Sequence, residues 1–175
     1  GRALLYLGSP AGLGNSPAWA REGNQIDAFY GSSVAAAGDV NGDGYSDVIV
    51  GAASFDNGEA NEGRAFLYCG SPGGLAGPSW IGESNMAGAG FGSAVAGAGD
   101  VNDDGYADLL VGADGYTNDK ENEGAVYVFY GKSSGVNPTP IIIEGNRRNC
   151  HMGQAVAGGG DVNGDGICDI LIGVP

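Results

Sequence analysis

The stretch DVNGDGYSD at residues 39–47 occurs twice more with small changes, as DVNDDGYAD at residues 100–108 and DVNGDGICD at residues 161–169. Each copy has oxygen-bearing side chains at positions 1, 3, 5 and 9, and a glycine at position 6, where a sharp turn leaves no room for a side chain. Ca²⁺ takes roughly six to eight oxygen ligands, and alternating Asp and Asn on a tight loop can direct several of them toward one point. The three copies therefore predict three calcium-binding loops.

The predicted ligands are the four side chains at positions 1, 3, 5 and 9 of each loop and the backbone carbonyl at position 7. They are Asp39, Asn41, Asp43, Tyr45 and Asp47 in the first loop, Asp100, Asn102, Asp104, Tyr106 and Asp108 in the second, and Asp161, Asn163, Asp165, Ile167 and Asp169 in the third. An EF-hand would need Glu at position 12, which is instead Val50, Val111 or Ile172 within an apolar run. A metal-free Asp/Asn/Gly turn is the weaker alternative, because the same ligand positions occur three times.

The composition indicates a turn-rich β-protein rather than a fibrous or disordered chain. Glycine accounts for 36 of the 175 residues, but there is no Gly-X-Y repeat, and 42% of the residues are hydrophobic. No segment shows a helical period of apolar residues. We therefore expect one all-β domain with a sizeable core.

The chain is strongly acidic, with a formal net charge of −14 and a pI near 4.1. This charge argues against nucleic acid as a partner, and no apolar run is long enough to insert into a membrane. Ten of the 21 acidic residues lie in the three loops, so about three bound Ca²⁺ per chain would reduce the net charge to about −8. Such loops suit an extracellular or cell-surface location for a secreted protein, because calcium is plentiful there.

The three loops belong to a longer internal repeat with a period of 61 residues, the spacing of Asp39, Asp100 and Asp161. Trp19 and Trp80 have the same spacing, but the third repeat has Ile141 at this place. We therefore expect the two tryptophans to be packing anchors, since a ligand-stacking platform would need the ring in every repeat.

Each repeat contains four segments typical of short strands. In the first complete repeat they are a run of small residues at 30–39, an apolar run at 47–53, an aromatic-rich run at 63–70 and a segment around Trp80. The small residues predict a strand that lies close to other backbones, and the apolar run predicts a strand buried on both faces. Four-stranded units at a fixed period are typical of a β-propeller.

The pairing of Phe91-Gly92 with the later Val-Gly-Ala-Asp sequence at 111–114 resembles the FG-GAP repeat of integrin α-subunit propellers and of their bacterial relatives. Tyr30 and Met152 replace the phenylalanine in the other repeats, and the last repeat is the least typical. The resemblance covers essentially all 175 residues. It implies a β-propeller of four-stranded blades in which each loop holds Ca²⁺ between the first two strands of a blade.

The resemblance also implies a non-catalytic, calcium-stabilised extracellular scaffold or adhesion module. The expected partners are a second copy of the chain, an extracellular protein or a glycan. The alternatives are a Ca²⁺-dependent lectin and the propeller part of a larger secreted enzyme. The single histidine, His151, belongs to no repeated site, and neither a G-x-S-x-G nor an H-E-x-x-H motif is present, so we expect no catalytic residues. The polar and acidic loops at 54–62 and 115–123 are the expected docking surfaces.

We expect three FG-GAP blades in residues 1–175. Residues 30–85 and 91–146 each provide one blade, and the third would combine 152–175 with 1–22, in cis or from another chain. A propeller ring has roughly four to eight blades. The hypotheses are therefore a homodimer that closes a six-bladed ring, an open fibre, or a fragment of a longer chain with further blades.

Overall fold

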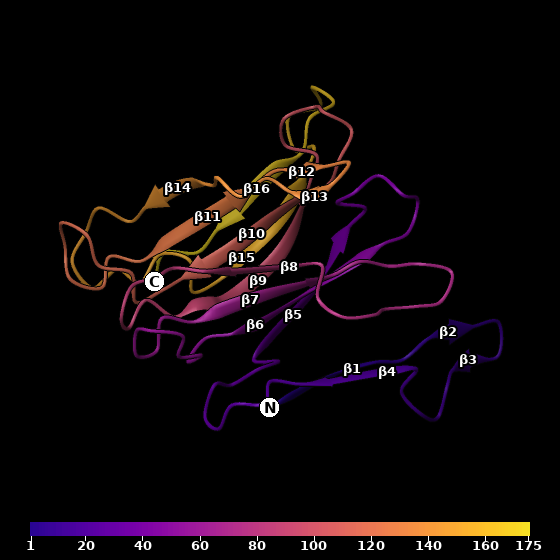
Figure 1. Cartoon of the computed structure of the whole chain (residues 1–175). Helices are drawn as coiled ribbons and strands as arrows, with labels where there is room; N and C mark the ends of the chain where they lie inside the picture. Colours follow the sequence, from indigo (N-terminus) through magenta and orange to yellow (C-terminus); the bar gives the residue numbers. More distant parts are fainter.

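The computed structural model describes all 175 residues as β-strands joined by turns and loops, with no helix. Two four-stranded antiparallel sheets occupy the centre, and a two-stranded sheet lies at each end of the stack (Figure 1). The all-β prediction is confirmed. There is accordingly no helix with the length and apolar character needed to cross a membrane.

The central sheets follow the chain in simple up-and-down order. The first sheet consists of β5 (Ser33–Gly38), β6 (Asp47–Ala52), β7 (Arg64–Tyr68) and β8 (Trp80–Glu83). The second sheet consists of β9 (Phe91–Gly99), β10 (Asp108–Ala113), β11 (Ala125–Phe129) and β14 (Ile141–Glu144). These are the four strands per repeat that the sequence predicts, and β6 and β10 are almost completely buried, as expected.

The two end sheets correspond to different parts of a four-stranded sheet. The N-terminal pair joins β1 (Arg2–Leu5) to β4 (Trp19–Glu22), and the C-terminal pair joins β15 (Val156–Gly160) to β16 (Asp169–Ile172). In the N-terminal pair Arg2 lies opposite Glu22, as Arg64 lies opposite Glu83 in β7 and β8, so this pair corresponds to the outer strands of a sheet.

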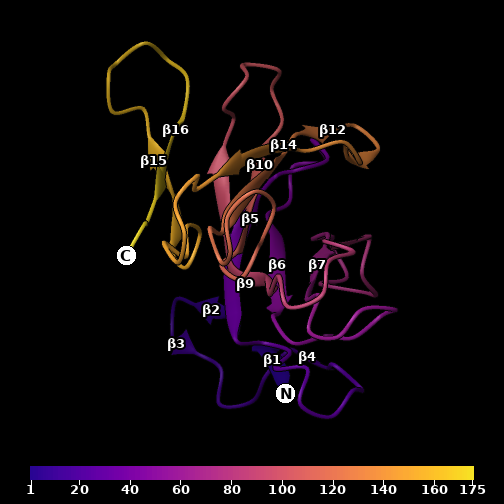
Figure 2. The same ribbon diagram turned by 90° about the vertical axis from the view of Figure 1, so that its left-hand side faces the viewer.

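In the C-terminal pair Val156 lies opposite Ile172, as Val34 lies opposite Val50 in β5 and β6. This pair therefore corresponds to the inner strands of a sheet. The two pairs form separate sheets and lie at opposite ends of the molecule (Figures 1 and 2).

Two short hairpins lie in segments predicted only as turns. They are β2 (Gly8–Ser9) with β3 (Gly12–Leu13), and β12 (Gly131–Lys132) with β13 (Gly135–Val136). Gly12 and Gly135, with φ of 101° and 105°, provide the tight reversals.

The sheets stack through their inner strands, with β9 between β5 and β15. Each junction has its own apolar cluster. The central cluster includes Ile49 and Leu67 of the first sheet, and Phe91, Leu109 and Val111 of the second. One face of every central sheet thus contributes to the preceding junction, and its other face contributes to the next.

The tryptophans lie at the outer part of these junctions. The ring of Trp19 meets the ring of Tyr68 edge-on at 4.8 Å between centroids, and Trp80 meets Phe129 in the same way at 4.8 Å. Each tryptophan therefore connects one sheet to the next. The prediction that they are packing anchors is confirmed.

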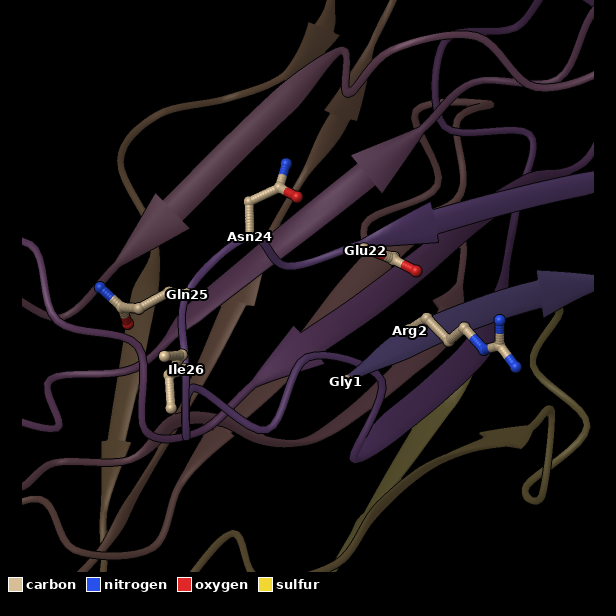
Figure 3. Close-up of a pocket in the computed structure, with 6 residues that line it drawn as sticks. All are labelled: Gly1, Arg2, Glu22, Asn24, Gln25 and Ile26. Atoms are coloured by element: carbon tan, nitrogen blue, oxygen red, sulfur yellow. The ribbon is translucent and has the colours of Figure 1, made fainter.

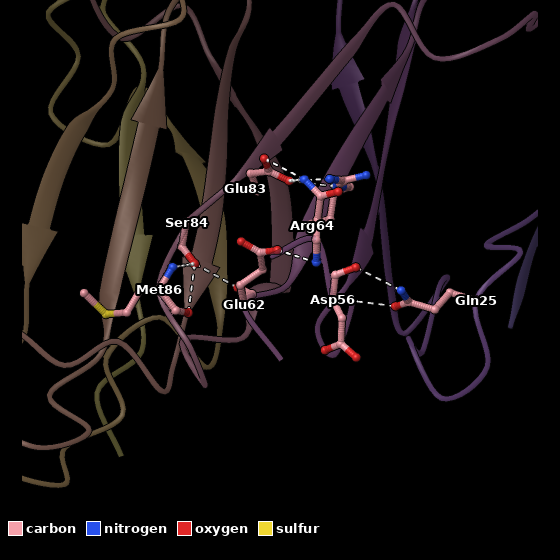
Figure 4. A network of polar contacts seen from close by, with 8 residues as sticks. Gln25, Asp56, Glu62, Arg64, Glu83, Ser84 and Met86 are labelled. Atoms are coloured by element: carbon pink, nitrogen blue, oxygen red, sulfur yellow. Dashed lines mark hydrogen bonds and ion pairs between the residues drawn. The ribbon is translucent and has the colours of Figure 1, made fainter. Parts of the chain in front are cut away.

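Polar contacts tie the same junctions together at the end opposite the predicted loops. The side chain of Gln25 makes two hydrogen bonds to the backbone of Asp56, at 2.9 and 2.8 Å (Figure 4). Within the first sheet, Arg64 forms an ion pair with Glu83. The N-terminal pair is thereby fixed to the first sheet by polar as well as apolar contacts.

The inner strands approach closely because two glycines have no side chain. A Cβ added to Gly51 would lie 2.0 Å from the carbonyl oxygen of Gly92, and one added to Gly112 would lie 2.0 Å from that of Gly153. Neither Gly51 nor Gly112 has a positive φ, so the requirement is for space alone. The predicted close backbone packing of the small-residue strands is confirmed.

We expect Gly112→Ala to destabilise the fold, because the added methyl group must push the second sheet away from the backbone of Gly153. Overpacking of this kind costs about 1–3 kcal/mol. Gly73→Ala is the matched control, because a Cβ there would meet only Ser71 Oγ at 3.7 Å in an exposed turn. Urea unfolding curves measure both variants, and equal midpoints would contradict the steric argument.

Candidate metal centre

Each predicted calcium loop joins the two inner strands of one sheet, and the three loops project from the same end of the stack (Figure 1). The glycine at position 6 of each loop has a left-handed backbone, with φ of 87° at Gly44, 89° at Gly105 and 92° at Gly166. Asp103 at position 4 also has a positive φ of 59°, which Asp tolerates better than most residues. The loop backbone therefore makes the sharp turn that the sequence predicts.

The side chains at positions 1 and 3 direct oxygens toward a common point. In the first loop, Oδ1 of Asp39 and Oδ1 of Asn41 both accept a hydrogen bond from the N–H of Asp43, each at 3.0 Å. Oδ2 of Asp39 accepts one from Gly44 at 2.8 Å, and Oδ1 of Asp43 accepts one from Tyr45 at 2.9 Å. The same four contacts recur in the other two loops.

The aspartate at position 9 has different surroundings. Asp47 is fully buried, and its two oxygens accept hydrogen bonds from Val40 at 3.0 Å and Gly70 at 2.8 Å. Asp108 makes the equivalent bonds at 2.9 and 2.8 Å. In both repeats this carboxylate connects the start of its loop to the end of the third strand.

Asp169 makes only the first of these bonds, from Val162 at 2.8 Å. β15 and β16 form a two-stranded sheet, and the bonds from Gly70 and Gly131 occur only in the two four-stranded sheets.

Local electrostatics follow from this arrangement. Burial raises the pKa of Asp47, the backbone N–H groups of Gly70 and Val40 oppose the shift, and the charges of Asp43 and Asp39 add to it. For Asp100, burial alone would raise the pKa, but the backbone N–H donors of its own loop have the larger combined effect. The net result is a lowered pKa. In the first two loops the carboxylates at positions 1 and 5 therefore repel the one at position 9, and a bound cation would relieve that repulsion.

The donor set fits a hard cation. The oxygens at positions 1, 3 and 5 belong to two carboxylates and an amide, which are ligands that Ca²⁺ prefers. No group of three or more His, Cys, Asp and Glu side chains lies close enough together to hold a metal ion. Positions 1, 3 and 5 of each loop provide only two such residues, both Asp, together with one Asn. The carboxylate at position 9 accepts hydrogen bonds from backbone N–H groups instead. Because a carboxylate has about four lone-pair sites, these hydrogen bonds leave capacity for a cation. Coordination by the fifteen predicted residues stays a prediction.

Neighbouring loops contact one another directly. The N–H of Ala107 donates to the carbonyl of Asp39 at 3.0 Å, and the N–H of Cys168 donates to the carbonyl of Asp100 at 3.0 Å. Gly38 precedes the first loop, where a Cβ would lie 2.6 Å from that of Ala107. The three candidate centres therefore form one row in which each loop supports the next.

Two buried carboxylates were missed from the sequence. Glu62 and Glu123, predicted to lie in polar docking loops, are 1% and 0% exposed. Glu123 accepts hydrogen bonds from the backbone N–H groups of Asn118, Lys120 and Asn146. These acids hold their loops in shape and are not available to a partner, which corrects that part of the prediction. The two glutamates are 61 residues apart, and each directly precedes a glycine, Gly63 or Gly124. This repetition was the sign in the sequence that they have a structural role.

Other parts of the chain provide no comparable cluster. A polar depression of about 470 Å³ at the N-terminal pair is lined by Gly1, Arg2, Glu22, Asn24, Gln25 and Ile26 (Figure 3). Ile26, its one hydrophobic residue, is 90% exposed. His151 has its Nδ1 within 3.0 Å of the carbonyl of Asp114, where it connects two loops.

Comparison with known proteins identifies the repeat. The FG-GAP repeat family matches residues 30–68 and 91–129, which include the first two candidate loops with the strands on either side of them. The chain therefore carries FG-GAP repeats, as its sequence predicts.

Its relatives include integrin α subunits. It is 34% identical to integrin α-6 of Gallus gallus over 157 residues and 31% identical to integrin α-4 of Xenopus laevis over 157 residues. It is also 34% identical to integrin α-2 of Bos taurus over 162 residues. These matches cover 86–87% of the chain but only 14–15% of the length of each relative.

Two substitutions in the second loop separate the two roles of its aspartates. We expect Asp108→Ala to lower stability with or without calcium, because it leaves two backbone N–H groups without their acceptor, at about 1–3 kcal/mol each when buried. Asp104→Ala should lower the melting temperature mainly in calcium, because Asp104 is an exposed candidate ligand. Thermal melts of both variants in calcium and in EDTA test this, and a calcium-independent loss for Asp104→Ala would argue against its role as a ligand.

Proposed function

We propose that the chain is a calcium-stabilised, non-catalytic module of the extracellular adhesion type, built from FG-GAP propeller blades. The observation that carries the proposal is the row of three loops, each with the same oxygens at positions 1, 3 and 5 at the same end of the stack. One bound Ca²⁺ per loop would relieve the repulsion between its carboxylates and stiffen the connection between the inner strands.

The stacking of the sheets supports the propeller part of the proposal. Each central sheet runs from an inner strand beside its neighbours to an outer strand, and successive sheets meet through opposite faces. This is the relation of successive blades in a propeller. In this reading the first and second sheets are complete blades, and the two end pairs are halves of a blade.

The proposed extracellular location and adhesion role rest on the similarity to integrin α subunits and on the acidic loops. The proposed lack of catalysis rests on the use of the polar groups. The single histidine connects two loops, and the buried glutamates hold loop backbones.

Calcium should raise the melting temperature of the chain. A ligand that binds only the folded state stabilises it by RT ln(1 + [L]/Kd), about 2.7 kcal/mol per site at a hundredfold excess over Kd. Calorimetric titration should give about three ions per chain. Magnesium at equal ionic strength is the control for general charge screening. Equal melting temperatures in calcium and EDTA would refute the proposed stabilisation.

A further inference from the structure

The first two loops are joined by a continuous path of hydrogen bonds. In the second sheet the N–H of Gly131 donates to the carboxylate of Asp108 at 2.8 Å, and the N–H of the next residue, Lys132, donates to the carbonyl of Val40 at 3.1 Å. The N–H of Val40 in turn donates to the carboxylate of Asp47 at 3.0 Å. Val40, Asp47 and Asp108 are all fully buried. The path therefore connects the position-9 carboxylates of the two loops through backbone groups alone.

The second loop also contacts the first through two consecutive residues. The ring of Tyr106 lies against the backbone of Gly42, where a Cβ would be 2.7 Å from Cε1 of the ring. The N–H of Ala107 donates to the carbonyl of Asp39 at 3.0 Å. Tyr106 is at position 7 of its own loop, so its backbone carbonyl is a predicted calcium ligand there. One residue thus links the ligand set of the second loop to the backbone of the first.

The junction between the second and third loops repeats part of this arrangement. The N–H of Cys168 donates to the carbonyl of Asp100 at 3.0 Å, so position 8 of the later loop again bonds to position 1 of the loop before it. The third loop has Ile167 rather than a tyrosine at position 7. The packing of a tyrosine ring on a glycine is therefore a feature of the first junction.

These contacts give calcium in one loop an effect on the next. A bound ion would fix the ligand groups of its own loop, and in the second loop those groups include both ends of the contacts to the first. With the second loop fixed, Tyr106 and Ala107 hold the first loop close to the arrangement that its own ion needs. The second ion then loses less conformational freedom on binding, which is positive cooperativity. By linkage the factor is the same whichever loop fills first.

Electrostatics alone would give the opposite sign, because an ion in one loop repels an ion in the neighbouring loop. Asp43 and Asp104 are exposed, however, and salt screens charges in contact with solvent over about 8 Å at physiological ionic strength. The buried backbone path is not screened in this way. We therefore expect the hydrogen bonds and the packing of Tyr106 to decide the sign.

We propose that the first and second loops bind calcium cooperatively, coupled by Tyr106 and by the path from Asp108 to Asp47. This inference rests on the proposed function, since it concerns the regulation of the same calcium sites. The two loops fill over a narrower range of calcium concentration than independent sites do. The module thus responds to calcium as a switch rather than gradually.

Calorimetric titration of three variants of the whole chain measures the coupling. Asp165→Ala leaves the first two loops, Asp104→Ala with Asp165→Ala leaves the first, and Asp43→Ala with Asp165→Ala leaves the second. For independent sites, the product of the two association constants in the two-site chain equals the product of the single-site constants. We expect it to be larger by a factor of about 5–150, the usual range for coupled sites. An equal or smaller product would overturn the inference.

Added salt separates the backbone path from an electrostatic cause. The coupling factor should stay constant or rise with added potassium chloride, because salt screens only the repulsion that opposes it. A factor that falls to one in high salt would overturn the hydrogen-bonded path as its cause.

Gly42→Ala tests the contact with Tyr106, because the new methyl group must displace the ring. Gly44→Ala is the matched control in the same loop, since its φ of 87° is as left-handed as the 73° of Gly42 but a Cβ there meets nothing within 4 Å. The single-site chains measure the loss that backbone strain causes in the first loop itself. Gly42→Ala should bring the coupling factor close to one, and Gly44→Ala should keep it. Equal factors in the two variants would overturn the role of Tyr106.

The same titrations separate this inference from the proposed function. Single-site chains that bind calcium, with no coupling in the two-site chain, would overturn the inference and leave the proposed function intact. Single-site chains that bind no calcium would contradict the proposed function itself.

Discussion

The inner strands of neighbouring sheets approach so closely that glycine is required where they meet. Gly51 and Gly112 place the backbone of one sheet against the carbonyl of the next, and no other residue fits in that space. The small residues of β5, β9 and β15 meet the same requirement, since a Cβ added to Gly97 would lie 2.7 Å from the carbonyl oxygen of Ala36, and one added to Gly158 would lie 2.6 Å from that of Gly97. Because adjacent inner strands lie side by side, the loops that follow them also lie side by side.

The row of loops is a consequence of the stacking. The carbonyl of Asp39 accepts a hydrogen bond from Ala107 in the next loop, so the position of one loop helps to set that of its neighbour. Within a loop the carboxylates have separate roles. Asp39 and Asp43 organise the tight turn and present oxygens, whereas the buried Asp47 connects the loop to the third strand. A cation would thus act on a frame that hydrogen bonds already hold.

Much of this architecture was predictable because it is periodic. The 61-residue spacing located four strands per repeat, the three loops and the packing role of Trp19 and Trp80. The short hairpins were missed because Gly and Ser in a turn segment do not reveal whether two residues on each side pair.

Other features depend on contacts distant in sequence, which a local pattern does not contain. Glu123 has the sequence context of a solvated loop acid, but the N–H of Asn146, 23 residues further on, adds to the nearby donors Asn118 and Lys120 that hold its buried carboxylate. Likewise, Asp47 reads as a fifth ligand, and its bond to Gly70 appears only when the third strand is in place.

Long-wavelength anomalous diffraction from crystals grown in calcium would locate bound ions in the three loops. We expect one anomalous peak in each loop, about 2.3–2.6 Å from the oxygens at positions 1, 3 and 5. An ordered structure with the same sheets and hydrogen-bonded loops, but without peaks at saturating calcium, would contradict it.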